Sequence, residues 1–190
     1  MQYSILATAG LLLVASPLSA QVPPNSDALL AAERAALAKL AFMDGIWRGP
    51  AWSITPTGRK EVTQAERIGP FLDGTVKVLE GRGYLPDGSV GFNAFGTISF
   101  NPATQAYVLH AYAQGYGGDF PFRVTPTGYV WEVPSGPGAI IRYTATIGEG
   151  RWREIGERVA GQAPPLQIFE MNLKRVGDTG WPAANPVPMR

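Results

Sequence analysis

Between residues 46 and 175, short segments of alternating apolar and polar residues are separated by residues that favour tight turns. A period of two is typical of β-strands that bury one face. The turn signals are TPTG at 55–58 and again at 125–128, PDG at 86–88, NPAT at 101–104 and SGPG at 135–138. The expected strands span 46–54, 60–68, 75–85, 90–100, 106–114, 122–124 continuing through a turn into 129–133, 139–147, 151–159 and 166–175.

Short connections between successive strands favour an antiparallel up-and-down sheet. Such a sheet can close on itself, which removes its exposed edges. We therefore predict an all-β fold, a β-barrel of about 8–10 strands. In the first strand, Gly49 and Pro50 are expected to bend the chain or to interrupt its pairing.

One amphipathic α-helix is expected before the first strand. Asn25 or Ser26 can cap its N-terminus, and Gly45 offers a left-handed stop at its end. Its apolar stripe consists of Leu29, Leu30, Ala36, Leu37, Leu40 and Ala41. We expect this stripe to lie across the open end or the side of the sheet.

The N-terminus has the pattern of a secretory signal peptide. Residues 1–20 contain no charged side chain, an apolar run at 9–15, a break at Pro17 and a small residue at Ala20. The expected organisation is a signal peptide at 1–20, a linker at 21–25, the barrel domain with its helix at 26–176 and an extended tail at 177–190. We expect a periplasmic or secreted protein.

Composition excludes several partners and chemistries. Lys plus Arg number 16 and Asp plus Glu 15, so no strong field attracts nucleic acid, and no segment after the N-terminus is apolar enough to span a membrane. With no Cys and one His, the chain lacks a disulfide, a thiol nucleophile and a zinc or iron–sulfur ligand set. We expect no metal and no cofactor; the oligomeric state stays open.

Three motifs resemble the calycin group, which includes the lipocalins and fatty-acid-binding proteins. They are FMDGIWRG at 42–49, FLDGTVKVLEGRG at 71–83 and FEMNLKRVGDTGWP at 169–182, and more narrowly they are similar to secreted bacterial lipocalin-like domains of unknown function. The resemblance implies that Trp47 closes the narrow end of the barrel under Arg175 or Lys174, through a cation–π contact. It is evidence for fold rather than ligand.

Some barrels related by this fold bind haem through a histidine on a late strand. The last two expected strands of this chain contain no histidine. Haem would need His110 in an unusual position, so the absence of a cofactor is the favoured expectation.

Alternation groups polar residues with apolar ones on single strand faces, but it leaves two interpretations of which face points inward. In one, the polar groups enter the lumen and contact a ligand; in the other they face solvent, and Leu79, Leu109 and Ala111 point inward. The candidate ligand-binding residues are Glu66, Glu80, Arg82, His110, Tyr112, Trp131 and Arg142.

His110 is the single histidine, and its ordinary pKa suits proton transfer near neutral pH. If the protein is an enzyme, His110 would act as general acid or base with Tyr112 assisting, oriented by Glu66, Glu80, Glu154 or Glu157. The Gly-rich aromatic segment 114–122 is expected to form a loop that could serve as a lid over the barrel.

Three functions fit these observations. The favoured one is binding of a small apolar or aromatic molecule in the lumen, because the strands carry more aromatic side chains than one small barrel needs. The second is an isomerase, cyclase or lyase that works without a cofactor. The third is a structural barrel with a filled interior and no pocket.

The expected signal peptide gives a test of export. We expect N-terminal sequencing of the protein recovered from the periplasm or medium to begin at Gln21, because signal peptidase cleaves after a small residue such as Ala20. Recovery of a chain that retains residues 1–20 would contradict this prediction.

Overall fold

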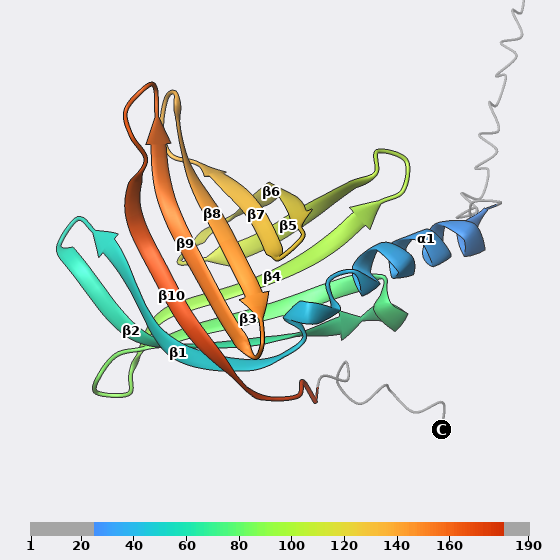
Figure 1. Ribbon diagram of the computed structural model, residues 1–190, viewed down its shortest axis with the longest axis horizontal. Helices are drawn as coiled ribbons and strands as arrows, with labels where there is room; N and C mark the ends of the chain where they lie inside the picture. Colours follow the sequence, from blue (N-terminus) through green and yellow to red (C-terminus); the bar gives the residue numbers. More distant parts are fainter. Residues whose placement is uncertain (1–24, 181–190) are drawn as a thin grey trace, which may run out of the picture.

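The computed structural model describes residues 25–180, which form a closed antiparallel barrel of ten strands preceded by one short helix (Figure 1). This confirms the predicted all-β, up-and-down architecture. The predicted signal peptide at 1–20 lies outside the described residues. The elements are α1 Ser26–Ala38, η1 Ala41–Met43, β1 Gly45–Thr55, β2 Gly58–Phe71, η2 Leu72–Gly74, β3 Val76–Tyr84, β4 Val90–Asn101, β5 Ala106–Ala113, β6 Tyr116–Thr125, β7 Gly128–Pro134, β8 Ala139–Gly148, β9 Arg151–Ala160 and β10 Leu166–Gly177.

Each strand pairs with the next in sequence, and β1 pairs with β10 to close the barrel. Ala51 of β1 lies opposite Met171 of β10. The register between β1 and β2 runs without a break and places Gly49 opposite Gln64 and Pro50 opposite Thr63. The expectation that Gly49 and Pro50 interrupt pairing is therefore wrong for the β2 side, but it holds on the β10 side, where the register passes from Arg48–Lys174 to Ala51–Met171 without a partner for either residue.

Strand β6 was not expected in full. The prediction of a loop lid over 114–122 is wrong, because only Gln114 and Gly115 form the turn and the strand begins immediately after them. Glycines in this segment indicate close aromatic packing rather than a loop. A Cβ atom at Gly117 would lie 2.6 Å from Cδ1 of the Tyr112 ring on the neighbouring strand.

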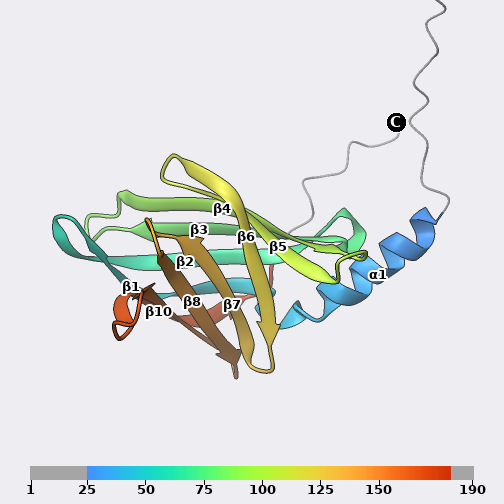
Figure 2. The same ribbon diagram turned by 90° about the horizontal axis from the view of Figure 1, so that it is seen from above.

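Helix α1 lies at one end of the barrel and contacts β3, β4 and η2, while the β1–β2 hairpin lies at the opposite end (Figures 1 and 2). The helix ends at Ala38, not at Gly45 as expected. A 3₁₀ turn at Ala41–Met43 follows and directs Leu40 and Met43, both with no exposed surface, into the end of the barrel. Burial of these two side chains explains the early end of the helix.

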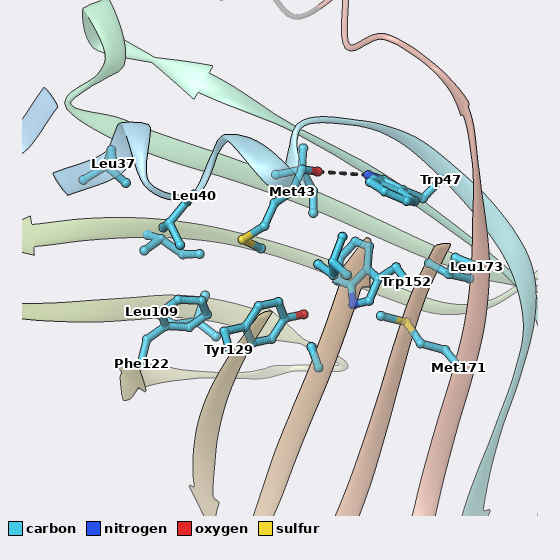
Figure 3. Packing of buried hydrophobic residues seen from close by; sticks show 14 of the residues in the cluster. Leu37, Leu40, Met43, Trp47, Leu109, Phe122, Tyr129, Trp152, Met171 and Leu173 are labelled. Carbon is cyan, nitrogen blue, oxygen red and sulfur yellow. Dashed lines mark hydrogen bonds between the residues drawn. The ribbon is translucent and has the colours of Figure 1, made fainter. Parts of the chain in front are cut away.

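Trp47 lies at the centre of this closed end (Figure 3). Its side chain is 2% exposed, and its Nε1 donates a 2.9 Å hydrogen bond to the carbonyl oxygen of Met43. Its ring meets the edge of Trp152 at a centroid distance of 5.7 Å. An indole whose N–H is satisfied in this way can be buried without an unpaired donor.

Arg175 is the β1–β10 register partner of Trp47, in line with the implied position of a basic residue over this tryptophan. Its guanidinium donates to the carbonyl oxygen of Asp44 from Nε and Nη2, each at 3.3 Å. The cation–π contact found among the described residues is a different one, Arg59 over Trp52 at 4.2 Å. Arg175 therefore ties the start of β1 to β10 through a hydrogen bond.

A buried ion pair also holds the closed end. Lys77 of β3 has 3% of its side chain exposed, and its Nζ donates to the carboxylate of Asp44. Burial lowers the pKa of Lys77, and the neighbouring Asp44 opposes this effect. Removing one partner of such a pair leaves a buried charge without compensation.

The close packing of β1 against β10 gives a test of the barrel geometry. A Cβ atom at Gly49 would overlap the carbonyl oxygen of Asn172 and lie 3.0 Å from the Cα atom of Leu173. We expect Gly49→Ala to lower the free energy of unfolding by about 2 kcal/mol or more, because backbone atoms cannot easily move aside.

Thermal unfolding followed by circular dichroism measures this change. Gly148→Ala is the matched control, because a Cβ atom there meets no atom within 4 Å. Equal melting temperatures for the two variants would contradict the close approach of β1 and β10.

Candidate functional site

The barrel encloses a cavity of about 610 Å³. Its lining extends to Thr55 and Lys60 in the β1–β2 hairpin, at the end of the barrel opposite α1 (Figure 1). Tyr129 and Trp152 belong both to this lining and to the packed cluster of the closed end (Figure 3). The cavity is therefore a blind pocket with one packed end, and the barrel interior is not filled.

Two glutamates occupy this otherwise largely apolar lining. Glu66 projects inward from β2, where Val62 and Gln64 share its face, and Glu154 projects inward from β9 beside Trp152. The alternation of the strands turns these side chains to the lumen. The two carboxyl groups form the polar part of the candidate site.

Glu154 is held by hydrogen-bond donors from β7. The hydroxyl of Tyr129 donates to Oε2, and Nε1 of Trp131 donates to Oε1 at 3.3 Å. Only 5% of Glu154 is exposed, and this burial raises the pKa of its carboxyl group to about 7. The donors oppose the rise, because they stabilise the ionised form.

Trp152 adds an indole N–H to the same region. Its Nε1 is buried and forms no hydrogen bond among the described residues, yet the group lies close enough to lower the pKa of Glu154. Buried donors without a partner are uncommon in folded proteins. The indole N–H of Trp152 thus lies beside the Glu154 carboxyl group and adds to the polar part of the site.

Glu66 is the more accessible of the two carboxyl groups. It is half-buried and borders the cavity, and Nε2 of Gln64 donates to its Oε1 at 2.6 Å. Burial raises the pKa of Glu66 to about 8; Gln64 opposes the rise, while the charges of Glu154 and Glu80 add to it. The carboxyl groups of Glu66 and Glu154 are thus close enough to interact electrostatically.

The tyrosines near Glu154 remain protonated at neutral pH. Burial raises the pKa of Tyr143 to about 12, and the charge of Glu154 adds to the rise. The same two causes raise the pKa of Tyr129 well above its ordinary value. Tyr129 therefore serves as a hydrogen-bond donor to Glu154.

No cation faces the two carboxyl groups among the described lining residues. The basic side chain in the lining is that of Lys60, whose Nζ donates to the carbonyl oxygen of Gly91 at 2.7 Å near the hairpin end. The titratable lining residues are Lys60, Glu66, Tyr112, Tyr116, Tyr129, Tyr143 and Glu154. The candidate site therefore carries an acidic pair that no basic residue of the lining neutralises.

The structure decides between the two interpretations of the strand faces. Leu79, Leu109 and Ala111 line the cavity, as do Glu66, Tyr112 and Trp131 among the predicted ligand-binding residues. Four other predicted ligand-binding residues face the outer wall of the barrel, away from Glu66 and Trp131. They form ion pairs or hydrogen bonds there, and they are Glu80, Arg82, His110 and Arg142.

Ion pairs explain the outward positions of three of these residues. Glu80 accepts from Arg67 at 2.8 Å and from Arg82 at 2.9 Å, and Arg142 pairs with Glu132 at 2.8 Å. These pairs are partly exposed, so water stabilises the charges that the apolar lumen would not.

His110 belongs to a hydrogen-bonded chain on the outer wall. Its Nδ1 bonds to the carboxylate of Asp119 on β6, and its Nε2 lies 2.8 Å from the hydroxyl of Tyr112. The His110 side chain is 43% exposed and does not line the cavity, whereas Tyr112 also borders it. His110, the predicted acid or base, is thus separated from the cavity that holds Glu66 and Glu154.

Sequence reasoning missed the principal partners of the acidic pair. Glu154 was considered only as a group that could orient His110, and Gln64, Tyr129 and Tyr143 were not singled out. The sequence WREIG at 152–156 places Glu154 on the same face as Trp152, and this is the signal that could have identified it.

Residues 25–180 contain neither a metal-binding cluster nor a membrane-spanning helix. No group of three or more His, Cys, Asp or Glu side chains is arranged to hold a metal ion there. In the same range, no helix is long and apolar enough to cross a membrane.

Comparison with known proteins shows the fold and nothing narrower. No family model matches the sequence, and no curated protein sequence matches it. Among solved structures, the crystal structure of Rv2717c from M. tuberculosis superposes with a TM-score of 0.56 at 14% identity, over 74% of this chain and 97% of that one. The chain thus shares its barrel fold with that protein.

The raised pKa of Glu66 predicts how stability depends on pH. The carboxyl group has an ordinary pKa of 4.5 in the unfolded chain and about 8 in the folded protein, so the folded state holds the proton more tightly. Stability should therefore fall as pH rises through this interval. We expect Glu66→Gln to remove part of this fall.

Thermal melts at about pH 5 and about pH 9 measure the effect. At the higher pH the variant should melt at least about 3 °C above the wild-type protein, since about 1 kcal/mol shifts the melting temperature of such a domain by about 2–4 °C. Glu157→Gln, on the outer face of β9, should melt like the wild-type protein. An unchanged pH dependence in Glu66→Gln would contradict the burial of this carboxyl group.

Proposed function

We propose that this protein binds a small amphipathic molecule in the barrel, with an apolar or aromatic body and one polar end. The observation that carries the proposal is the 610 Å³ cavity, which is large enough for a small ligand and has apolar walls with a few polar groups gathered at Glu66 and Glu154. Small-molecule sites commonly combine these features.

Aromatic side chains support an aromatic or apolar body for the ligand. Trp131 and Tyr143 stack at a centroid distance of 4.3 Å, and the edge of Phe120 packs against Trp131. All three line the cavity. Rings held in this way by their neighbours provide a flat apolar surface that needs little reorganisation when a ligand binds.

The polar end of the ligand would contact Glu66 first. Glu66 retains accessible surface at the cavity, whereas Glu154 is 5% exposed and is already held by Tyr129 and Trp131. Together with export, which the pattern of residues 1–20 favours, this describes a binding protein that meets its ligand in the periplasm or outside the cell.

A cavity-filling variant tests the proposal. We expect wild-type protein to bind the neutral aromatic dye N-phenylnaphthylamine saturably, with one site per chain and enhanced dye fluorescence. Ala111→Trp should weaken binding at least about tenfold, because Ala111 points into the cavity and the indole would occupy the space of the dye.

Ala106→Trp is the matched control, because Ala106 lies exposed on the same strand and outside the cavity lining. Ala94→Phe provides a second cavity-filling variant should Ala111→Trp fail to fold, as judged by circular dichroism. Absence of saturable binding to folded wild-type protein, or equal binding by all variants, would overturn the proposal.

A further inference from the structure

The acidic pair in the cavity has no cation to neutralise it among the described lining residues. We propose that the polar end of the ligand is itself a cation, a protonated amine or a guanidinium group on an apolar or aromatic skeleton, which contacts Glu66 and Glu154. This inference rests on the proposed function and identifies the chemical class of ligand that the same cavity selects.

The hydrogen bonds around Glu154 favour its ionised form. Tyr129 and Trp131 both donate to its carboxylate, one to each oxygen. Donors at both oxygens stabilise negative charge. The surroundings of Glu154 are therefore arranged for a carboxylate, although burial opposes its ionisation.

A ligand cation would offset the effect of burial, which opposes the ionisation of Glu66 and Glu154. Burying two carboxylates without a counter-charge is unfavourable, so in the free protein burial raises the pKa of both groups. A positive charge within reach of both carboxyl groups offsets the cost of desolvation and lets them ionise. Binding should then release protons from the protein.

The aromatic rings around Glu154 also suit a cation. Tyr129 and Trp131 contact its carboxylate directly, Tyr143 stacks on Trp131, and the edge of Trp152 packs near Tyr129 at a centroid distance of 6.2 Å. Tryptophan and tyrosine faces attract ammonium and guanidinium groups, most strongly in desolvated sites. The indole N–H of Trp152, buried beside Glu154, adds a further donor to this end of the cavity.

The same charges disfavour an anion. A ligand carboxylate would approach Glu66 and Glu154 without a nearby basic residue, since the Lys60 amine is bonded to Gly91 at the hairpin end. Arg82 and Arg142, which could have received an anion, face the outer wall and pair with Glu80 and Glu132. The barrel therefore discriminates by charge.

Three probes of nearly equal shape test this inference. Naphthylmethylamine, naphthylmethanol and naphthylacetate carry a positive, a neutral and a negative polar group on one ring system. Displacement of N-phenylnaphthylamine at about pH 7 should rank the amine tightest, at least about tenfold tighter than the alcohol, and the acetate weakest.

Two variants assign the selectivity to the acidic pair. Glu66→Gln and Glu154→Gln keep an oxygen acceptor for Gln64 and for Tyr129, and each should weaken amine binding at least about tenfold while alcohol binding stays within about twofold. Glu157→Gln, on the opposite face of β9, should change neither. Proton release on amine binding, measured calorimetrically in buffers of different ionisation enthalpy, supplies an independent readout.

Outcomes distinguish this inference from the proposed function. If the dye and the alcohol bind but the amine binds no more tightly than the alcohol, the inference of a cationic ligand is wrong, whereas the proposal of binding in the lumen stands. Tightest binding of the alcohol would indicate that protonated carboxyl groups donate to a neutral acceptor, and tightest binding of the acetate would likewise overturn the inference. If no probe binds, the proposed function fails first.

Discussion

The barrel depends on its closure at one end, and this closure depends on how Trp47 is buried. The indole can occupy the apolar floor because its N–H donates to the Met43 carbonyl oxygen and because the edge of Trp152 packs against it. The 3₁₀ turn supplies that carbonyl group, and the same turn directs Met43 into the barrel. With the floor packed in this way, an open cylinder becomes a cavity closed at one end, and its depths are removed from bulk water.

Removal from water raises the pKa values of the Glu66 and Glu154 carboxyl groups. On the outer wall β3 carries Glu80, and there pairing with arginines and access to solvent accommodate the charge. Inside, the protein provides donors to its glutamates but no cation among the described lining residues. The free protein thus retains an unfavourable electrostatic arrangement, and such arrangements are commonly found at functional sites rather than in purely structural cores.

Periodicity in the sequence was sufficient to predict the barrel, because alternation and turn residues act locally. It failed at β6, where Gly117 accommodates the ring of Tyr112 and the pattern resembles a loop. It also could not choose the inward face, since Glu66 and Glu80 are both charged and only closure of the barrel determines which one enters the lumen. Glu66 and Trp131 were predicted as site residues, but Glu154 was not, because its partners come from β7 and are brought to it by tertiary structure.

Gly81 on β3 sets the shape of the acidic end of the cavity. A Cβ atom at this position would lie 2.7 Å from Oε1 of Glu66, so the carboxyl group can lie against the wall only because position 81 lacks a side chain. A larger residue at position 81 would push Glu66 towards the centre of the lumen and shorten the space beside it. The space beside the acidic pair is therefore governed by a residue that carries no functional group, and a substitution here would reshape the cavity while keeping every strand in place.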